Sequence, residues 1–444
     1  MSRSGVGSLG RFAQQVGYGK GVRLSLLLAV VCLGALGLSV RASSGAPGEL
    51  VVARLYVRDR EHLAAVADEL DIWEVHYDAG FAVVAVTPDQ VQWLRSLGYR
   101  LEVDEEATAG ILGVQAPLDP RYYYFDDNYA NANERYVVDF LHDVNAAYPS
   151  LTELLDIGNA WQAEQSGTYH HRDLWVLRIS NEDAAYGDIV QKPAFFLLAT
   201  IHAREVAVPE LAIRYIQYLT GGYDGEGGYG LDPDVTWLVD HHVAYILVMD
   251  NPDGHRMNEA STSAYRRKNM DNDDGCSSPT SWGVDLNRNH SFFWNQGGSS
   301  GDPCGETYRG PSAASEPETQ AFQAYFASVM RDQNGANGDY ELPPEAPDNA
   351  TGLFITLHSY SDLVLWPWGH TYASAPNGSQ LQTIGRKFAY FNHYVPQQAS
   401  DLYFVSGSSD DWTYGKFGVA SFTFEVGPGW PYNTTACAGF FPDY

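Results

Sequence analysis

Positive charge is scarce in this sequence, and the scarcity excludes a large class of functions. Lysine and arginine total 27 residues against 55 aspartates and glutamates, so the formal net charge of the 444-residue chain is −28. A surface this acidic repels phosphate backbones, and no cluster of basic residues occurs outside the N-terminus. We therefore expect no nucleic-acid partner.

Internal repeats of useful length are also missing, and only 18% of the residues are charged. Hydrophobic residues make up 45% of the chain and aromatic residues 13%, which is enough for a large core. This composition excludes extended disorder, collagen and coiled coil as descriptions of the whole chain. At roughly 100–200 residues per domain, the length corresponds to two or three domains, or to one large domain.

One long hydrophobic run occurs, from Leu24 to Val40. Basic residues precede it, no acidic residue occurs before Glu49, and the residues before Ala42 suit a cleavage site after that position. This pattern predicts a signal peptide over residues 1–42 and a secreted protein, extracellular or periplasmic, whose only membrane contact is this segment. The run has 17 residues, near the short limit for a spanning helix, so an uncleaved membrane anchor is the alternative.

Cysteine is rare, with four residues in the chain. Cys32 lies in the hydrophobic run and leaves with a cleaved signal peptide, so Cys276, Cys304 and Cys437 remain. In an oxidising compartment this odd number predicts one disulfide and one leftover cysteine. Cys276 and Cys304 flank a loop rich in glycine and serine, and we expect these two to pair; two free thiols are the alternative.

Residues 49–104 read as a small domain. Apolar patterns predict strands and helices in the order βαββαβ, which is typical of a ferredoxin-like split unit. The strands are expected at 51–57, 73–76, 81–86 and 99–103, and the helices at 60–70 and 88–97. Residues 105–118 contain acidic residues with glycine, alanine and proline, so we interpret them as a cleavable connector.

Residues 119–444 alternate strands and helices in one α/β pattern. Short apolar runs predict buried strands in a mixed, mostly parallel sheet with helices on both faces. The strands are expected at 194–200, 243–249, 354–357 and 420–424, and the helices at 135–148, 209–219, 316–330 and 381–391.

Residues that bind metals or transfer protons follow three of these strands. His202 and Glu205 come after the first, His358 ends the second, and Glu425 ends the third. Ligands gather at the carboxyl edge of open α/β sheets, and two histidines with one carboxylate leave a coordination position of Zn²⁺ open for water. Glu425 then supplies a carboxylate base. An isolated H-x-x-E pair is a weak signal, because such pairs are common on solvated helix faces.

The polar segment around Asp285 supplies further groups. Asp285 can accept the second ring N–H of His202 and so fix its tautomer. Arg288 can hold a carboxylate through its planar fork, with Asn287 beside it as a donor. Arg267 can polarise a carbonyl and stabilise a developing oxyanion.

Two other motifs are interpreted as structural. The segment 297–301 fits G-x-S-x-G, but it lies in the expected disulfide loop and lacks the strand and helix that a nucleophile elbow needs. The acidic segment 271–275 departs from the spacing of an EF-hand calcium loop, so we interpret it as a solvated turn.

Together these motifs resemble the zinc metallocarboxypeptidase family, of the pancreatic carboxypeptidase A/B type with its secreted bacterial relatives. The resemblance extends from about Tyr122 to the C-terminus, and the motifs occur in the family's order. They are H-x-x-E at 202–205, N-P-D-G at 251–254, R-K at 267–268, G-V-D-x-N-R-N at 283–289, H-S-Y-S at 358–361, S-S-D-D-W at 408–412 and S-F-T-F-E at 421–425. The stretch 303–310 matches part of a family disulfide loop and supports the pairing of Cys276 with Cys304.

The resemblance implies an enzyme, a zinc-dependent metallocarboxypeptidase that hydrolyses the C-terminal peptide bond of peptides and proteins. It implies one Zn²⁺ per chain, held by His202, Glu205 and His358. It also implies that Glu425 is the general base for the attacking water and that Arg267 stabilises the oxyanion.

Substrate binding is implied in the same way. Asn287, Arg288 and Tyr403 correspond to the residues that bind the free α-carboxylate, which an internal peptide bond does not have. Tyr360 and Arg204 correspond to residues that line the outer subsites.

Asp410 stands where the family's pocket for the C-terminal side chain has its floor, so we expect a preference for C-terminal Lys or Arg. The alternatives are that Asp410 turns to solvent, that Asp411 holds this position instead, or that specificity is mixed. A related metallopeptidase that acts on cell-wall cross-peptides and a catalytically inactive binding module are the competing functions.

The N-terminal domain resembles the family's activation domain in size and element order, so we expect a zymogen with this domain as pro-domain. Family members usually continue into a C-terminal helix packed on the sheet, and this helix is expected to be missing because the sequence stops at Tyr444. We expect a monomer.

Overall fold

The structure, a computed structural model, describes residues 50–113, 136–166, 172–225, 230–260, 265–335, 343–427 and 440. The expected signal peptide over residues 1–42, together with Cys32 and Cys437, lies outside this range. Within the described ranges, no helix is both long enough and apolar enough to cross a membrane.

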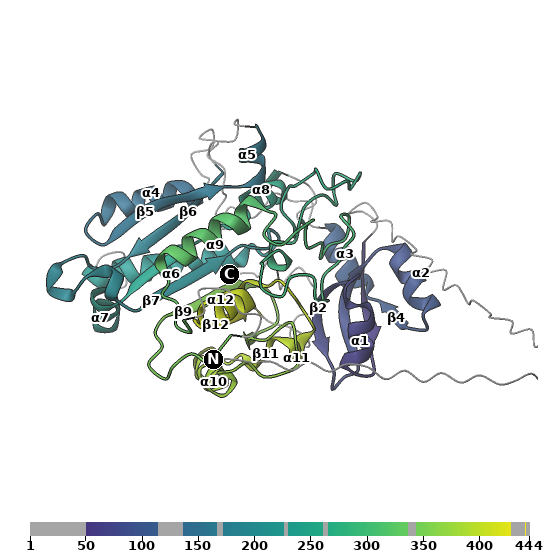
Figure 1. The fold of residues 1–444 in the computed structure, drawn as a ribbon. Helices are drawn as coiled ribbons and strands as arrows, with labels where there is room; N and C mark the ends of the chain where they lie inside the picture. The colour runs from purple at the N-terminus through teal and green to yellow at the C-terminus, as the bar shows by residue number, and fades with distance from the viewer. Residues whose placement is uncertain are drawn as a thin grey trace, which may run out of the picture. The chain divides into compact units, whose positions relative to one another are not determined.

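The N-terminal domain has the βαββαβ order expected from the sequence (Figure 1). Its elements are β1 (Val51–Tyr56), α1 (Arg60–Ala67), β2 (Asp71–His76), β3 (Phe81–Val86), α2 (Pro88–Ser96) and β4 (Arg100–Val103). The strands form one antiparallel sheet in the order β2-β3-β1-β4. Helix α2 begins where Thr87 and Gln90 form a reciprocal capping box, and Leu55, Val84 and Leu94 are fully buried in the core.

The connector expected at residues 105–118 begins with a helix, α3 (Glu105–Gly113). The side chain of Asp104 accepts a hydrogen bond from the backbone N–H of Ala107, and two glutamates occupy the first turn. Acidic residues favour a helix N-terminus because its unpaired N–H groups and dipole are positive, so the acidic composition indicated a helix start and not only a linker. Residues 114–118 lie outside the described residues.

The larger sheet has eight strands in the order β11-β10-β12-β9-β7-β8-β6-β5. Strands β9, β7 and β8 are parallel neighbours, β12 is parallel to β9, and β10 is parallel to β11, while the other pairs are antiparallel. This is the mixed, mostly parallel sheet that the sequence predicted. The strands are β5 (Thr152–Asn159), β6 (Asp173–Ile179), β7 (Ala194–Ala199), β8 (Val243–Leu247), β9 (Leu353–His358), β10 (Leu363–Trp366), β11 (Val395–Gln398) and β12 (Ala420–Glu425).

Helices cover both faces of this sheet, because alternate strand residues point to opposite sides. Phe196 of β7 packs against Phe322 and Phe326 of α9 with ring centroids 5.5 and 5.4 Å apart, whereas Phe195 contacts Tyr215 of α6 at 5.8 Å. The α-helices are α4 (Val137–Ala147), α5 (Trp161–Ser166), α6 (Ala207–Asp224), α7 (Pro233–His241), α8 (Pro252–Ala260), α9 (Pro317–Val329), α10 (Gly378–Asn392), α11 (Ala399–Leu402) and α12 (Ser409–Phe417) (Figure 1).

The face on the α6 side contains an apolar cavity of about 610 Å³. Residues of α6, α7 and α10 line it together with alternate residues of the sheet, among them Leu211, Leu238, Ile355 and Phe388. None of the residues expected to bind the metal or the substrate lines this cavity.

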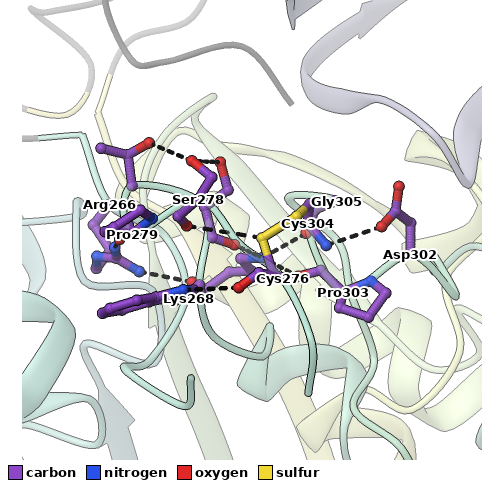
Figure 2. Close-up of a disulfide and its surroundings, with 12 residues drawn as sticks. Arg266, Lys268, Cys276, Ser278, Pro279, Asp302, Pro303, Cys304 and Gly305 are labelled. Carbon is purple, nitrogen blue, oxygen red and sulfur yellow. Dashed lines mark hydrogen bonds between the residues drawn. A yellow bond between two sulfur atoms is a disulfide. The ribbon is translucent and has the colours of Figure 1, made fainter. Parts of the chain in front are cut away.

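A disulfide joins Cys276 to Cys304, with their Cα atoms 5.1 Å apart. Figure 2 shows Lys268 beside this bridge, directed at the loop that the bridge closes. The Lys268 ammonium donates hydrogen bonds to the carbonyl oxygens of Ser281 (2.6 Å), Gly305 (2.8 Å) and Pro303 (3.2 Å), and burial lowers its pKa to about 8. Because Ser281 lies in the first part of the loop and Pro303 and Gly305 flank Cys304 at its end, Lys268 and the disulfide together fix the backbone next to Arg267.

Candidate active site

The sheet topology brings the sequence-predicted metal ligands and base to one edge. His358 is the last residue of β9, Glu425 is the last residue of β12, and the two strands pair in parallel with these residues in register. His202 and Glu205 follow β7, which is the other neighbour of β9. Parallel strands end at the same edge of a sheet, so all four residues meet at the carboxyl ends of three adjacent strands.

His202, Glu205 and His358 form a buried cluster that could hold a metal ion. The Nδ1 atom of His202 lies 2.6 Å from Glu205 Oε1 and 3.1 Å from His358 Nδ1, and His358 Nδ1 lies 3.2 Å from Glu205 Oε2. Two imidazole nitrogens and a carboxylate are a donor set suited to Zn²⁺. Burial opposes the charge of Glu205, but the two histidines outweigh it and hold the pKa of Glu205 well below its usual range.

The outer ring nitrogens of both histidines are anchored, which directs the Nδ1 atoms toward the cluster. His202 Nε2 lies 3.2 Å from Asp285 Oδ1, in the contact that the sequence analysis expected. His358 Nε2 lies 3.2 Å from the hydroxyl of Thr356, a contact that the sequence analysis missed. The signal for it was present, because residues two apart on a strand share a face.

Asp285 also binds the arginine expected to stabilise an oxyanion. Its Oδ2 accepts a hydrogen bond from Nε of Arg267 at 2.9 Å and forms an ion pair with Nη2 of the same residue at 2.9 Å, and Arg288 Nε lies 4.0 Å from this oxygen. Burial opposes the charge of Asp285, but Arg267 and Arg288 outweigh it and hold its pKa well below the usual range. The carboxylate therefore links His202 to both arginines as a permanent negative charge.

Glu425 has the opposite environment. Burial raises the pKa of Glu425 to about 7, against the opposing attraction of His358. A carboxylate with a pKa near neutrality can accept and return a proton in the working range of most enzymes. This is the property expected of a general base beside a metal centre.

The residues expected to bind a substrate carboxylate lie next to Arg267. Arg288 donates from Nη1 to the carbonyl of Asn287 (2.8 Å), and Asn287 Oδ1 accepts from the Ser409 N–H (2.9 Å), so both side chains are held in place. Tyr403, which follows α11, lines a cavity of about 10 Å³ with Arg267 and Arg288. The structure thus brings Arg288, Tyr403 and Arg267 to one cavity, which Asn287 does not line.

Both residues expected at outer subsites contact the N-terminal domain. Asp71 of β2 accepts hydrogen bonds from Nη1 (2.6 Å) and Nη2 (2.8 Å) of Arg204, which is buried. Tyr360 is hydrogen-bonded to Glu74 of the same strand, and burial raises the pKa of Tyr360 well above its usual range. Asp71 also lines the small cavity with Arg267, so β2 reaches into the candidate substrate cleft.

The two aspartates at the start of α12 have different surroundings. Asp411 accepts hydrogen bonds from the N–H groups of Gly369 and His370 and from the ring Nδ1 of His370, so it fixes this turn. Asp410 accepts from Thr423 Oγ1 at 3.1 Å and is 4% exposed, which excludes the alternative in which it turns to solvent. Burial, reinforced by Asp411, raises the pKa of Asp410.

The acidic turn at 271–275 is partly buried, contrary to the sequence expectation of a solvated turn. Asp271, Asp274 and Glu316 form a second group of carboxylates whose oxygens lie within 4.8 Å of one another. Burial raises the pKa of Asp271 to about 6 and that of Glu316 to about 7. No local sequence pattern indicates this group, because Glu316, at the start of α9, is distant in the chain from the acidic turn.

Comparison with known proteins agrees with this geometry. The sequence model of the family described as zinc carboxypeptidase matches residues 137–443. A zinc carboxypeptidase of Saccharothrix mutabilis subsp. capreolus is 29% identical over 379 residues, covering 82% of this chain and 77% of the relative. Mast cell carboxypeptidase A of Rattus norvegicus is 26% identical over 376 residues, covering 81% of each.

Among solved structures, carboxypeptidase A from Helicoverpa armigera superposes with a TM-score of 0.63 at 20% sequence identity, covering 87% of this chain and 90% of that one. This likeness supports the fold alone. The family match covers more than half of the sequence and includes all of the clustered residues. The chain therefore belongs to the zinc carboxypeptidase family and is a zinc-dependent metallocarboxypeptidase.

Proposed function

We propose that the protein removes the C-terminal residue from peptides and proteins, with a preference for C-terminal Lys or Arg, and that it is secreted as an inactive precursor. The observation that supports the hydrolytic role is the convergence of His202, Glu205 and His358 beside Glu425 at one sheet edge. The basic preference rests on the buried carboxylate of Asp410.

His202, Glu205 and His358 would hold the zinc ion. Zinc bound there supplies Lewis-acid activation of water and of the scissile carbonyl. Glu425 takes a proton from the attacking water and delivers it to the leaving amine, because its pKa of about 7 suits both transfers. Arg267, which Asp285 holds in place, donates to the oxyanion as negative charge develops on the carbonyl oxygen.

The C-terminal carboxylate of the substrate binds to Asn287, Arg288 and Tyr403. Arg288 offers a planar fork of donors, which matches the geometry of a carboxylate. The cavity that Tyr403 lines with Arg267 and Arg288 supports this assignment. An internal peptide bond has no carboxylate for these groups, so the site acts on chain ends and favours ordinary C-terminal residues over cell-wall cross-peptides.

We assign residues 49–104 to a pro-domain, residues 105–118 to a segment that is cleaved on activation, and residues 119–444 to the catalytic domain. The contacts of Asp71 with Arg204 and of Glu74 with Tyr360 support an inhibitory role, since β2 then occupies space that a substrate needs. Secretion rests on the pattern of residues 1–42.

The first test is removal of the metal. We expect 1,10-phenanthroline to abolish release of C-terminal Arg from a blocked dipeptide by the proteolytically activated protein, and added Zn²⁺ to restore it. A non-chelating isomer of phenanthroline is the control and leaves the release unchanged. Activity that persists after metal analysis shows zinc to be absent would contradict the proposed chemistry.

Replacement of Asp71 tests the inhibitory role. Asp71→Asn leaves the buried guanidinium of Arg204 without its carboxylate partner, and breaking a buried ion pair in this way costs about 3–5 kcal/mol. We expect the uncut variant to release C-terminal residues faster than the uncut wild-type chain. Asp78→Asn, at an exposed position of the same domain, is the matched control and should leave the precursor inactive. Equal rates for both uncut variants would contradict this role.

A further inference from the structure

The guanidinium of Arg204 is a carboxylate-binding group whose partner comes from outside the catalytic part of the chain. Both terminal nitrogens donate to Asp71, and the side chain is 2% exposed. Among the described residues from 136 to 427, no carboxylate hydrogen-bonds to this guanidinium, and Glu306 attracts it only from a longer distance. The Nε atom is buried and has no hydrogen-bond partner within the described ranges of the chain.

The guanidinium of Arg204 also contacts aromatic rings from outside the N-terminal domain, which remain when that domain is removed. The guanidinium carbon lies 5.4 Å from the ring centre of Tyr265 and 4.9 Å from that of Phe440. Tyr360 packs against Phe440, with ring centres 5.0 Å apart. Tyr265 and Phe440 thus contact the guanidinium through their rings, while its two terminal nitrogens point to the position that the Asp71 carboxylate occupies.

The position of the Asp71 carboxylate shows from which side a carboxylate can bind Arg204. Burial opposes the charge of Asp71, but Arg204 and, to a smaller extent, Arg267 outweigh it and lower its pKa. The small cavity that Asp71 lines includes Arg267, Arg288 and Tyr403. Asp71 therefore contacts Arg204 and also borders the place in which the proposed function puts the end of a substrate, although Arg204 itself does not line this cavity.

We propose that Arg204 selects substrates with an acidic side chain close to the C-terminus, by binding the carboxylate of Asp or Glu where Asp71 binds in the precursor. This inference rests on the proposed function and adds a second element to its specificity. Removal of the N-terminal domain takes away the carboxylate that both terminal nitrogens of Arg204 bind, and a substrate carboxylate can restore this charged, two-pronged contact, whereas an amide of the same shape offers one acceptor oxygen and no charge. The acidic residue lies one or two positions before the residue that is removed.

The test compares blocked tetrapeptides that end in Arg and differ only by Glu or Gln at the second-to-last or third-to-last position. The zinc-loaded full chain, activated by limited proteolysis, is expected to show a kcat/KM about tenfold or more higher for Glu than for Gln at one of these positions. Arg204→Gln should bring this ratio close to one. Arg204→Lys should leave an intermediate ratio, since an ammonium lacks the two-pronged geometry.

Arg386→Gln, at an exposed position of α10, is the control and should keep the wild-type ratio. Equal kcat/KM values for Glu and Gln at both positions, or a ratio that survives Arg204→Gln, would overturn this inference. In either case, release of Arg from the Gln peptides would leave the proposed function intact. If no peptide loses its C-terminal residue, the proposed function fails and this inference fails with it.

Discussion

Replacing Glu425 by glutamine is expected to remove nearly all turnover while the metal centre remains loaded with zinc. Glutamine has almost the same shape as glutamate, but its amide cannot accept a proton from water. Positioned general bases contribute about 10²–10⁴-fold to rates, so we expect kcat to fall by roughly 10³-fold. The zinc content should stay near one per chain because Glu425 is not among the three clustered ligands.

Three measurements separate this outcome from a damaged protein. Metal analysis gives the zinc content, thermal unfolding reports folding, and kcat is measured on a peptide ending in Arg. Glu345→Gln, an exposed position outside the site, is the matched control and should retain wild-type kcat. Turnover by Glu425→Gln within tenfold of the wild type, with preparations free of wild-type protein, would show that another group is the base.

The sequence was sufficient for those parts of the fold that depend on local patterns. The runs around Phe196 and Phe354 are mostly apolar, with Thr356 as the exception in the second, because both faces of these strands are buried, and that pattern identified the central parallel strands. The more polar strands β5 and β11 at the sheet edges have no such run and were not predicted. Strand β6, which contains Asp173 and Arg178, and strand β10, which is apolar but only four residues long, were also missed. Helix α3 was missed because its glycine and alanine content suggested a linker.

The candidate site was predictable to a similar degree. Residues that end apolar strands, such as His358 and Glu425, could be assigned because topology brings parallel strand ends together. The pair formed by Asp71 and Arg204 joins residues 133 positions apart in two domains, and no local pattern indicates such a contact. Neighbouring side chains with similar sequence surroundings, such as Asp410 and Asp411, could be distinguished only by their hydrogen bonds.

Asp410 is expected to determine which C-terminal side chain the protein prefers to remove. The Asp411 carboxylate is occupied by the N–H groups of Gly369 and His370, which favours Asp410 as the group available to a substrate. In the part of the chain that the structure describes, the Asp410 carboxylate has Thr423, the N–H of Asp411 and Ser408 as hydrogen-bond partners, and no cation pairs with it. A C-terminal Lys or Arg would supply that cation, whereas an aromatic ring would leave the carboxylate buried and unpaired.

We therefore expect the activated wild-type protein to have a higher kcat/KM for peptides ending in Lys or Arg than for peptides ending in Phe or Leu. Asp410→Ile should lower kcat/KM for the basic peptides by about 10²-fold or more, because losing one member of a buried ion pair costs about 3–5 kcal/mol, and it should spare the apolar peptides. Zinc content and the thermal midpoint are measured alongside, to show that the change lies in the pocket.

The neighbouring substitution Asp411→Asn is the matched control, because it removes a charge of the same sign one residue away. It weakens the turn at Gly369 and His370, so it should lower the thermal midpoint while the ratio of basic to apolar kcat/KM stays near the wild-type value. A wild-type preference for Phe or Leu would overturn the assignment of Asp410 but not the carboxypeptidase activity. Similar rates for both classes would indicate a pocket of mixed specificity, in which the Asp410 carboxylate keeps enough hydrogen bonds to tolerate an apolar neighbour.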